Sequence, residues 1–332
     1  MRRREFIAGL GGAAAWPLAA RAQQRDRVRR VGVMTQWGEN DPNTKVFLLS
    51  AFVRGLAALG WSEGRNLRLD VRWAGGDPER VRLNAKDLVA QQPDVIFADS
   101  TPQTAALQRE TRTIPIVFVG VSDPVGSGFV AGLPRPGGNI TGFSIQDSSM
   151  AGKWVELLRE IAPDRKLVAA MFNPDTAPWV RTYYLPQFEA ATRSLKVQST
   201  VAPVHSEAEI QTVMTALGRG PAAGVVVMPD VFVYDRRALI FSLAVQYSVP
   251  TIYFTVFWVR DGGGLLSYGP DYADFYRRAA DYVDRILNGA KPEDLPVQLP
   301  VKFEMAVNVR TAKAIGLAIP ESFLLRADEV IE

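Results

Sequence analysis

Short apolar runs alternate with longer helical patterns along most of the chain. Residues 95–98 and 116–119 have the length and the β-branched content of strands that are buried on both faces of a parallel sheet. The stretch between them, like several later stretches, has the spacing of an amphipathic helix. Strands and helices that alternate in this way predict an α/β fold with doubly wound parallel sheets.

The first half of the chain predicts one such sheet with its helices, in the order β-α-β-α-β-α-β. Gly60 marks a helix end, and a Gly- and Pro-rich loop at 125–139 leads to an extended connector at 140–145. The expected strands lie at Arg29–Thr35, 66–73, 95–98 and 116–119, and the expected helices lie at 46–59, at 78–91 and between the last two strands.

The second half predicts a similar unit, which duplicates the structure of the first but not its sequence. Residues 265–269 are expected to form a strand that runs back toward the first unit. The expected strands lie at Leu167–Phe172, 197–203, 224–228, 251–254 and Phe303–Asn308, and the expected helices lie at Met150–Ile161, 180–195, 207–217, 236–247, Tyr272–Leu287 and 311–315.

Two α/β units connected by extended segments predict a hinged cleft between two lobes. The length of 332 residues also suits two domains that each have a core of their own. We expect lobe 1 to comprise residues 28–143 plus about 268–299, and lobe 2 to comprise 144–267 plus about 300–332.

The N-terminus has the features of an export signal. Arg2, Arg3 and Arg4 precede Glu5-Phe6-Ile7, residues 8–20 form a weakly apolar core, and Ala20-Arg21-Ala22 has the form of a cleavage site. An amphipathic helix is the alternative, but Gly-Gly and Trp-Pro pairs would break it. We therefore expect residues 1–22 to be a twin-arginine leader and the mature protein to be periplasmic.

Removing this leader changes the charge balance. The leader holds four of the 38 basic residues and one of the 35 acidic residues, which leaves 34 of each sign. A mature chain that is formally neutral gives no reason to expect a nucleic-acid partner. No apolar run of about 18 residues follows the leader, so no membrane insertion of the mature chain is expected.

Composition also excludes several kinds of chemistry. The chain has no cysteine and one histidine, which removes disulfides, thiolate metal sites and cysteine nucleophiles. Gly126, Gly128 and Ala131 match the spacing of a dinucleotide fingerprint, but they lie several residues past their strand and no helix of proper length follows. We therefore expect neither a metal nor a cofactor.

Four expected strand ends carry small polar residues beside a proline: Ser100-Thr101, Ser122-Asp123, Asn173 and Asp230. Thr101 can cap a helix whose first residue is Pro102, which leaves free N–H groups at the strand end. Each end alone could be an ordinary strand-to-helix turn. Because ligands bind at the carboxyl ends of strands in open α/β sheets, the four ends together predict one site built from two sheets.

Several motifs are shared with a known family. The motifs are Trp73-Ala74-Gly75-Gly76-Asp77-Pro78, Ile114-Pro115-Ile116-Val117-Phe118-Val119-Gly120, Asp123-Pro124-Val125-Gly126-Ser127-Gly128, Arg135-Pro136-Gly137-Gly138-Asn139-Ile140-Thr141-Gly142, Ser267-Tyr268-Gly269-Pro270-Asp271, Lys313-Ala314-Ile315-Gly316-Leu317 and Leu325-Arg326-Ala327-Asp328-Glu329-Val330-Ile331. With them the mature chain resembles the ABC transporter substrate-binding proteins that include the TrpX-type binders of aromatic amino acids. The resemblance implies a type I periplasmic-binding-protein fold: two Rossmann-like lobes, three crossings and a small ligand enclosed between the lobes.

One position departs from the family pattern. Many relatives carry an Arg-Glu pair after the strand at 251–254, where this chain has Val256, Phe257 and Trp258. If this loop faces the cleft, the site is more apolar and aromatic than is usual in the family, which suits an aromatic or aliphatic ligand.

A zwitterionic amino acid would need donors for its carboxylate and an acceptor for its ammonium group. Ser100, Thr101 and the helix behind them can supply donors, with Ser122 at the neighbouring strand end, while Asp230 or Asp123 can accept from the ammonium group. Asn173 can bridge the lobes, and three aromatic residues can enclose the side chain: Trp37, Phe254 and Tyr268. Core packing is the alternative for these three, and a helix cap is the alternative for Asp123.

Three classes of function remain open. The first is a receptor, expected as a monomer, that delivers a small ligand, an aromatic or branched amino acid, to the membrane permease of an ABC importer. The second is a sensor of the same fold that acts on a signalling partner. The third is an enzyme, which would need a nucleophile, an acid and a base at one site, and the sequence shows no such set. We expect the first.

Overall fold

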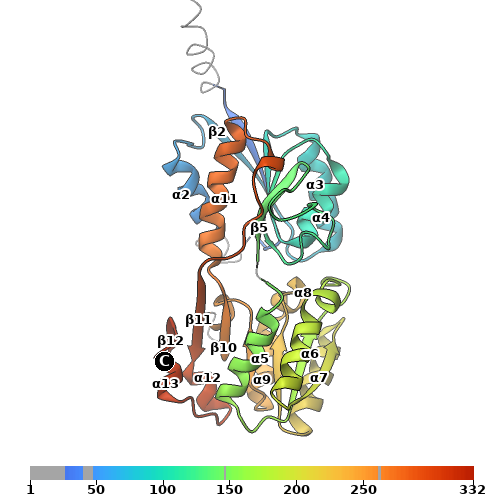
Figure 1. Cartoon of the computed structure of the whole chain (residues 1–332), viewed down its shortest axis with the longest axis vertical. Helices are drawn as coiled ribbons and strands as arrows, with labels where there is room; N and C mark the ends of the chain where they lie inside the picture. Colours follow the sequence, from blue (N-terminus) through green and yellow to red (C-terminus); the bar gives the residue numbers. More distant parts are fainter. Residues whose placement is uncertain (1–26, 40–47, 146, 261–262) are drawn as a thin grey trace, which may run out of the picture.

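A computed structural model of the chain describes residues 27–39, 48–145, 147–260 and 263–332. Figure 1 shows two α/β lobes arranged one above the other along the long axis of the molecule. The expected leader at 1–22 lies outside the described residues.

The sheet of lobe 1 contains five parallel strands in the order β2-β1-β3-β4-β5. Helices α3 (Pro78–Ala90) and α4 (Thr101–Glu110) pack against each other, while α2 (Ser50–Ala58) packs against α11 (Tyr272–Leu287). The strands are β1 (Arg29–Thr35), β2 (Leu67–Trp73), β3 (Val95–Asp99), β4 (Ile116–Val121) and β5 (Ile140–Ser144). Helix α11 therefore belongs to lobe 1 in space although it follows nearly all of lobe 2 in sequence.

Strand β5 corrects the expectation of an extended connector at 140–145. All five of its residues are buried, and it pairs in parallel with β4, with Ile140 beside Ile116. The sequence suggested a connector because Gly142 interrupts the apolar run. Glycine is needed there because a Cβ at Gly142, whose φ is +152°, would overlap the backbone of Phe118 in β4.

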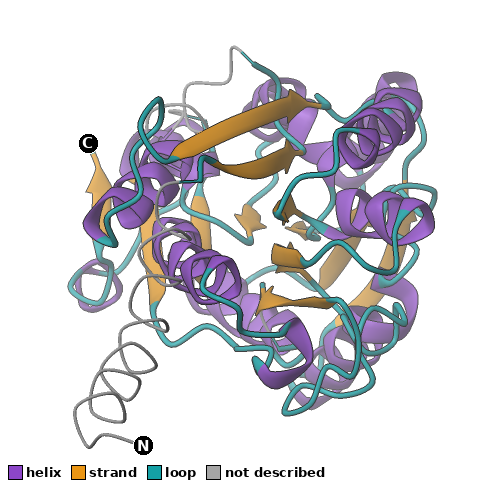
Figure 2. Cartoon of the chain, turned by 90° about the horizontal axis from the view of Figure 1, so that it is seen from above, coloured by secondary structure: helices purple, strands orange, loops and turns teal. Residues whose placement is uncertain are grey.

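The sheet of lobe 2 has seven strands in the order β12-β11-β10-β9-β8-β6-β7. All neighbouring pairs are parallel except β10 with β11. The strands are β6 (Leu167–Phe172), β7 (Gln198–Pro203), β8 (Ala223–Val227), β9 (Thr251–Tyr253), β10 (Leu266–Pro270), β11 (Phe303–Asn308) and β12 (Glu329–Ile331). The longer helices of this lobe are α5 (Met150–Ile161), α6 (Leu185–Ser194), α7 (Glu207–Arg219) and α9 (Arg237–Gln246). Figure 2 shows helices on both sides of the strands.

Strand β10 forms where a strand was expected at 265–269: it pairs with β9 and β11 in the lobe 2 sheet and leads into α11 of lobe 1. Several other elements of lobe 2 differ from the expectations. The expected helix at 180–195 is a π-helical turn, η2 (Val180–Tyr184), followed by α6, because Pro186 lacks the N–H group that a continuous α-helix needs. The helix expected at 311–315 is α12 (Val309–Ala314), which begins two residues earlier and ends one residue earlier than expected. The sequence did not indicate strand β12 or three short helices: α8 (Val231–Asp235), α10 (Phe257–Arg260) and α13 (Glu321–Leu324).

Three segments cross between the lobes: β5 to α5, β10 to α11, and α11 to β11. Ser144 N–H donates to the carbonyl of Gln298 at 2.9 Å, which joins the first crossing to the third. Asp271 joins the second crossing to the third, because its N–H donates to the Lys302 carbonyl at 3.1 Å and its Oδ2 lies 2.7 Å from Lys302 Nζ. The crossings therefore form one hydrogen-bonded hinge.

The buried apolar residues form two clusters. One fills the space between the lobe 1 sheet and α3 and α4, with Leu88 and Leu107 facing Ile96. The other begins under α2 and α11 and continues through lobe 2. In the described part of the chain, no helix has both the length and the apolar character needed to cross a membrane.

Candidate functional site

Each sheet reverses its strand order once beside the cleft. In lobe 1 the reversal lies between β1 and β3, and in lobe 2 it lies between β6 and β8. Polar groups follow the strands at both places, Ser100 and Thr101 after β3, Asn173 after β6 and Asp230 after β8. Such reversal points are where open α/β sheets bind ligands, so the topology places two binding edges opposite each other.

A cavity of about 30 Å³, which we call the inner cavity, lies where these two edges meet. It includes Tyr234 from lobe 2 and Tyr272 at the start of α11. Six residues expected from the sequence line it: Trp37, Ser100, Thr101, Ser122, Asp230 and Phe254. The structure therefore brings together residues of both lobes that are far apart in the sequence.

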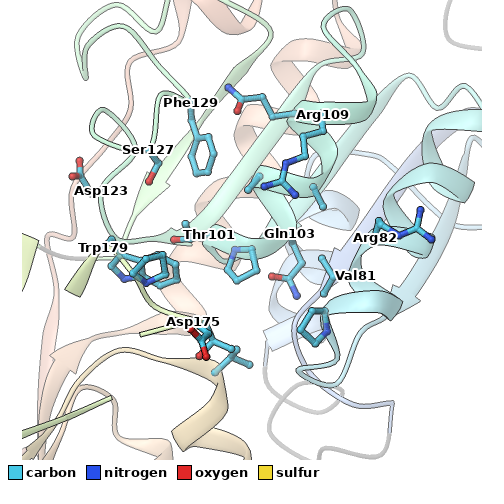
Figure 3. A pocket seen from close by; sticks show the side chains of 18 of the residues that line it. Val81, Arg82, Thr101, Gln103, Arg109, Asp123, Ser127, Phe129, Asp175 and Trp179 are labelled. Atoms are coloured by element: carbon cyan, nitrogen blue, oxygen red, sulfur yellow. The ribbon is translucent and has the colours of Figure 1, made fainter. Parts of the chain in front are cut away.

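A larger space of about 650 Å³, which we call the outer chamber, adjoins the inner cavity. Thr101, Pro102, Trp179 and Val231 line both spaces. Helix α4 and the loop at 123–129 form the lobe 1 side, and residues 175–182 form the lobe 2 side (Figure 3). Asp123 lines this outer chamber and not the inner cavity.

Helix α4 begins at Thr101, one residue earlier than expected, and no side chain caps it. Thr101 Oγ1 instead accepts a hydrogen bond from the Ser122 N–H at 3.4 Å, which holds the ends of β3 and β4 together. Ser100 adopts φ +86° and ψ 168°, a conformation that costs a non-glycine residue about 1–3 kcal/mol. Its Oγ donates to Oε1 of Gln103, which is buried in the first turn. The uncapped N–H groups give the cleft an edge that favours an anion.

Asp230 faces this edge from lobe 2 and caps the short helix α8. Its carboxylate accepts from the N–H groups of Asn173 at 2.8 Å and Phe232 at 3.0 Å, and from the Thr176 hydroxyl at 2.5 Å. Burial raises the pKa of Asp230, and these hydrogen bonds partly oppose the shift. The carboxylate has no cationic partner among the described side chains that bond it, so it retains acceptor capacity for a positively charged group.

The inner cavity is closed by aromatic rings from both lobes. Trp37 of lobe 1 packs edge-on against Tyr234 of lobe 2, with ring centroids 4.4 Å apart. Phe254 and Trp258 pack in the same way with centroids 6.0 Å apart, and Trp258 stacks on Tyr253. Trp258 and its neighbours Val256 and Phe257 are buried in the lobe 2 core and do not line either space. The apolar residues that replace the Arg-Glu pair of the family pattern therefore lie in the lobe 2 core, where Trp258 packs behind Phe254.

Two expected site residues lie outside both spaces. Tyr268 in β10 stacks on Phe303 across the antiparallel pair, with ring centroids 5.8 Å apart, and its carbonyl accepts from Trp154. Asn173 does not bridge the lobes: its side chain accepts from the N–H of Asp175, within lobe 2. Asp123 accepts from the N–H of Gly126 at 2.7 Å and so stabilises its own turn. In each case the side chain that we expected to contact a ligand has a partner within its own lobe.

A buried carboxylate lies behind the inner cavity that the sequence analysis did not single out. Asp99 at the end of β3 is fully buried, and burial raises its pKa to about 7. Thr35 donates to its Oδ2 at 3.2 Å, and Tyr276 and Trp37 face the carboxylate and lower its pKa, although Oδ1 has no partner at hydrogen-bond distance. In the sequence, the position of Asp99 directly before Ser100 at a strand end was the signal that could have identified it as a site residue.

Trp179 and Gln103 were also missed. Trp179 lines both spaces, and its indole Nε1–H is buried without a hydrogen-bond partner. Gln103 lies four residues after the end of β3 and Trp179 seven residues after the end of β6, and this closeness to strand ends was the only signal. Among the described residues, no group of three or more acidic or histidine side chains is placed to hold a metal ion.

The sequence as a whole matches the family described as ABC transporter substrate binding protein over residues 44–331. The chain belongs to this family. ABC transporter substrate-binding proteins are a solute-binding family. The two-lobed architecture is the type I periplasmic-binding-protein fold, which is also the fold of an ABC sugar transporter subunit from Rhodobacter sphaeroides and of an ABC transporter solute-binding protein from Agrobacterium vitis.

Several characterised or solved proteins are similar to this substrate-binding protein. A tyrosine-binding protein of Clostridioides difficile is 25% identical over 266 residues, which cover 80% of this chain and 75% of the relative. An ABC domain from Streptococcus pneumonia, solved in complex with L-Trp, is 25% identical with a TM-score of 0.82 and covers 91% of this chain and 99% of its own. A conserved domain protein from Vibrio cholerae is 30% identical with a TM-score of 0.83 and covers 92% of this chain and 100% of its own.

Proposed function

We propose that this protein is the periplasmic receptor of an ABC importer and that it binds an aromatic amino acid between its lobes. The observation that carries the proposal is the pairing of the uncapped N-terminus of α4 with the Asp230 carboxylate on the facing edge. An amino acid carboxylate would accept from Thr101 and the first turn of α4, and its ammonium group would donate to Asp230. The relatives named for tyrosine and L-Trp support this choice of ligand.

The two volumes suggest how the ligand lies. A cavity of about 30 Å³ has no room for an aromatic side chain, whereas the outer chamber of about 650 Å³ lies within the usual size of ligand pockets. Thr101 lines both, so a head group held there directs the side chain outward between Trp179 and Phe129. In this arrangement Trp37 and Phe254 close the inner end and exclude water from the charged groups.

Delivery to a permease follows from the hinge. A ligand that contacts both lobes stabilises the closed form over the open form, and a membrane permease can then recognise that form. The expected leader supports export to the periplasm, and we propose that the mature protein acts as a monomer. The contacts that we propose hold the ligand, and none of them is a catalytic step.

The experiment is calorimetric titration of the mature protein, refolded without ligand, with L-tryptophan, L-tyrosine, L-phenylalanine and L-leucine. We expect at least one aromatic amino acid to bind with a dissociation constant of about micromolar order. Thr101→Val, which removes one hydroxyl group without changing the size of the side chain, should weaken binding about tenfold, as expected for one hydrogen bond to a carboxylate.

Thr104→Val is the matched control, because Thr104 lies in the same helix, is buried and lines neither space. Its hydroxyl donates to the Ser100 carbonyl, so thermal unfolding is measured for both variants. If Thr101→Val and Thr104→Val bind equally well, the assignment of Thr101 to the carboxylate is wrong. If no amino acid binds to the unchanged protein, the proposed ligand class is wrong.

A further inference from the structure

We propose that the outer chamber selects aromatic ligands whose far end carries an anionic group, and that Arg109 binds this group. This inference rests on the proposed function, because it takes the amino acid head group to lie at Thr101. It adds a second polar contact at the opposite end of the ligand. The proposed ligands are then a narrower class, namely aromatic amino acids with an acidic substituent on the ring.

The charges that line the outer chamber are mostly satisfied within the protein. Arg82 forms a bidentate pair with Glu79, with nitrogen–oxygen distances of 2.6 and 2.9 Å. Asp175 Oδ2 lies 2.8 Å from Nδ1 of His205, and Asp123 accepts from Gly126. Arg109 is different: its side chain is exposed at the chamber wall, and among the described residues no acidic side chain forms an ion pair with it. An unpaired guanidinium on a chamber wall favours an anionic ligand group.

Gln103 and Trp179 offer two further hydrogen-bond donors in the outer chamber. The Oε1 atom of Gln103 is taken up by Ser100, so the group that this buried side chain can offer a ligand is its NH₂ donor. The Nε1–H of Trp179 is buried and has no acceptor. A buried donor without a partner costs free energy that a ligand acceptor would recover. Together these residues form a chamber rich in donors.

The positions of the side chains fit an extended ligand. Figure 3 shows Thr101 and Trp179 at one side of the outer chamber and Arg109 at the other side, above Gln103 and to the right of Phe129 in this view. Asp123 lies at the edge of the chamber opposite to Arg109 in the same view. The Asp123 carboxylate, which could repel a ligand anion, is therefore separated from the guanidinium, and Phe129 also lines the chamber.

The test uses three probes that differ in the substituent at the ring's para position, which is neutral in L-phenylalanine, anionic in 4-carboxy-L-phenylalanine and cationic in 4-aminomethyl-L-phenylalanine. Calorimetric titration should show that the carboxylated probe binds about tenfold more tightly than L-phenylalanine, and that the aminomethyl probe binds more weakly than both. Arg109→Gln should remove the preference for the carboxylated probe and leave L-phenylalanine binding within about twofold.

Arg112→Gln is the matched control, because it removes one exposed positive charge close to the same helix at a residue that lines neither space. We expect this variant to keep the full preference. Loss of the preference in both variants would mean that net charge decides it, and would overturn the assignment to Arg109.

The remaining outcomes separate this inference from the proposed function. If L-phenylalanine binds but the carboxylated probe binds no better, the inference is wrong and the proposed function stands. If Arg109→Gln weakens all three probes equally, Arg109 holds the α-carboxylate, which overturns the inference. If none of the probes binds, both proposals are wrong.

Discussion

Asp99 has an environment that is unusual for a carboxyl group. It is a fully buried carboxyl group, and every partner found for it in the described part of the chain is a neutral donor: Thr35, the backbone of Gln36, Trp37 and Tyr276. Burial disfavours the charged form, and the surrounding hydrogen bonds only partly compensate. The result is a pKa of about 7 next to the strand end that carries Ser100 and Thr101.

This environment predicts how stability changes with pH. An unfolded aspartate has a pKa near 3.8, so between about pH 4 and 7 the folded state binds more protons at Asp99 than the unfolded state does. The free energy of unfolding should therefore fall as the pH rises through this range. A pKa difference of roughly three units corresponds to about 4 kcal/mol as an upper value.

The measurement is chemical denaturation of the ligand-free protein at pH 5 and pH 8. Asp99→Asn, which cannot ionise, should reduce the loss of stability between the two pH values by a few kcal/mol. Thr35→Val serves as the control, because it removes a hydrogen bond to Asp99 but leaves the ionisable group in place. An equal pH dependence in Asp99→Asn and the unchanged protein would show that Asp99 does not carry the effect.

At the scale of elements, the close pairing of β4 and β5 decides where lobe 1 ends. The register places Gly142 beside Phe118, and the absence of a side chain allows the two backbones to approach. Without β5 the sheet would lose an edge strand that also bonds Gln298 of the hinge. One glycine therefore connects the sheet of lobe 1 to the crossings between the lobes.

Gly142→Ala should destabilise the protein strongly. A Cβ at this position would overlap the backbone of Phe118, which cannot move without separating the strands, and the φ of +152° is unfavourable for alanine. We expect a loss of at least about 3 kcal/mol in the free energy of unfolding. Gly138→Ala is the comparison, since nothing lies within 4 Å of a Cβ there. Similar midpoints of denaturation for the two variants would contradict this account.

At the scale of the whole molecule, the lobes touch at the rim of the cleft as well as at its aromatic inner end. Gly76, in the loop between β2 and α3, lies against Asp235 and Val231 of α8 in lobe 2. Trp37 and Tyr234 meet across the same boundary. Opening at the hinge would separate these contacts, so we expect them to contribute to ligand affinity through the closing equilibrium.

The rim contact can be tested by two neighbouring glycines. Gly76→Ala should weaken ligand binding about three- to fivefold, because its Cβ would overlap the Asp235 carboxylate and oppose closure. Gly75→Ala introduces similar backbone strain at φ +59° but has no lobe 2 atom near its Cβ, so it should bind normally. Small-angle scattering should show a larger radius of gyration for ligand-saturated Gly76→Ala alone. Equal affinities in the two variants would exclude the rim contact as a determinant of closure.

The sequence by itself determined the alternating strands and helices, because apolar periodicity follows from burial on a sheet or along a helix face. Strands β1, β6 and β11 and helices α5 and α11 have the expected bounds, as each is a strongly patterned run with clear ends. The sequence also indicated six residues of the inner cavity, because four of them are small polar residues that follow strands and ligands bind at the carboxyl ends of strands in open α/β sheets. The other two, Trp37 and Phe254, are aromatic residues.

Only the tertiary structure decided which ends face each other. Asn173 is a small polar residue after a strand, as Ser100 and Asp230 are, and Tyr268 is aromatic, yet local partners in lobe 2 satisfy both. Trp179 and Arg109 reach the outer chamber because of the order of strands and the angle between lobes, which no local pattern encodes. Periodicity fixes the face that a residue turns to its own sheet, whereas a binding site depends on contacts between segments far apart in the chain.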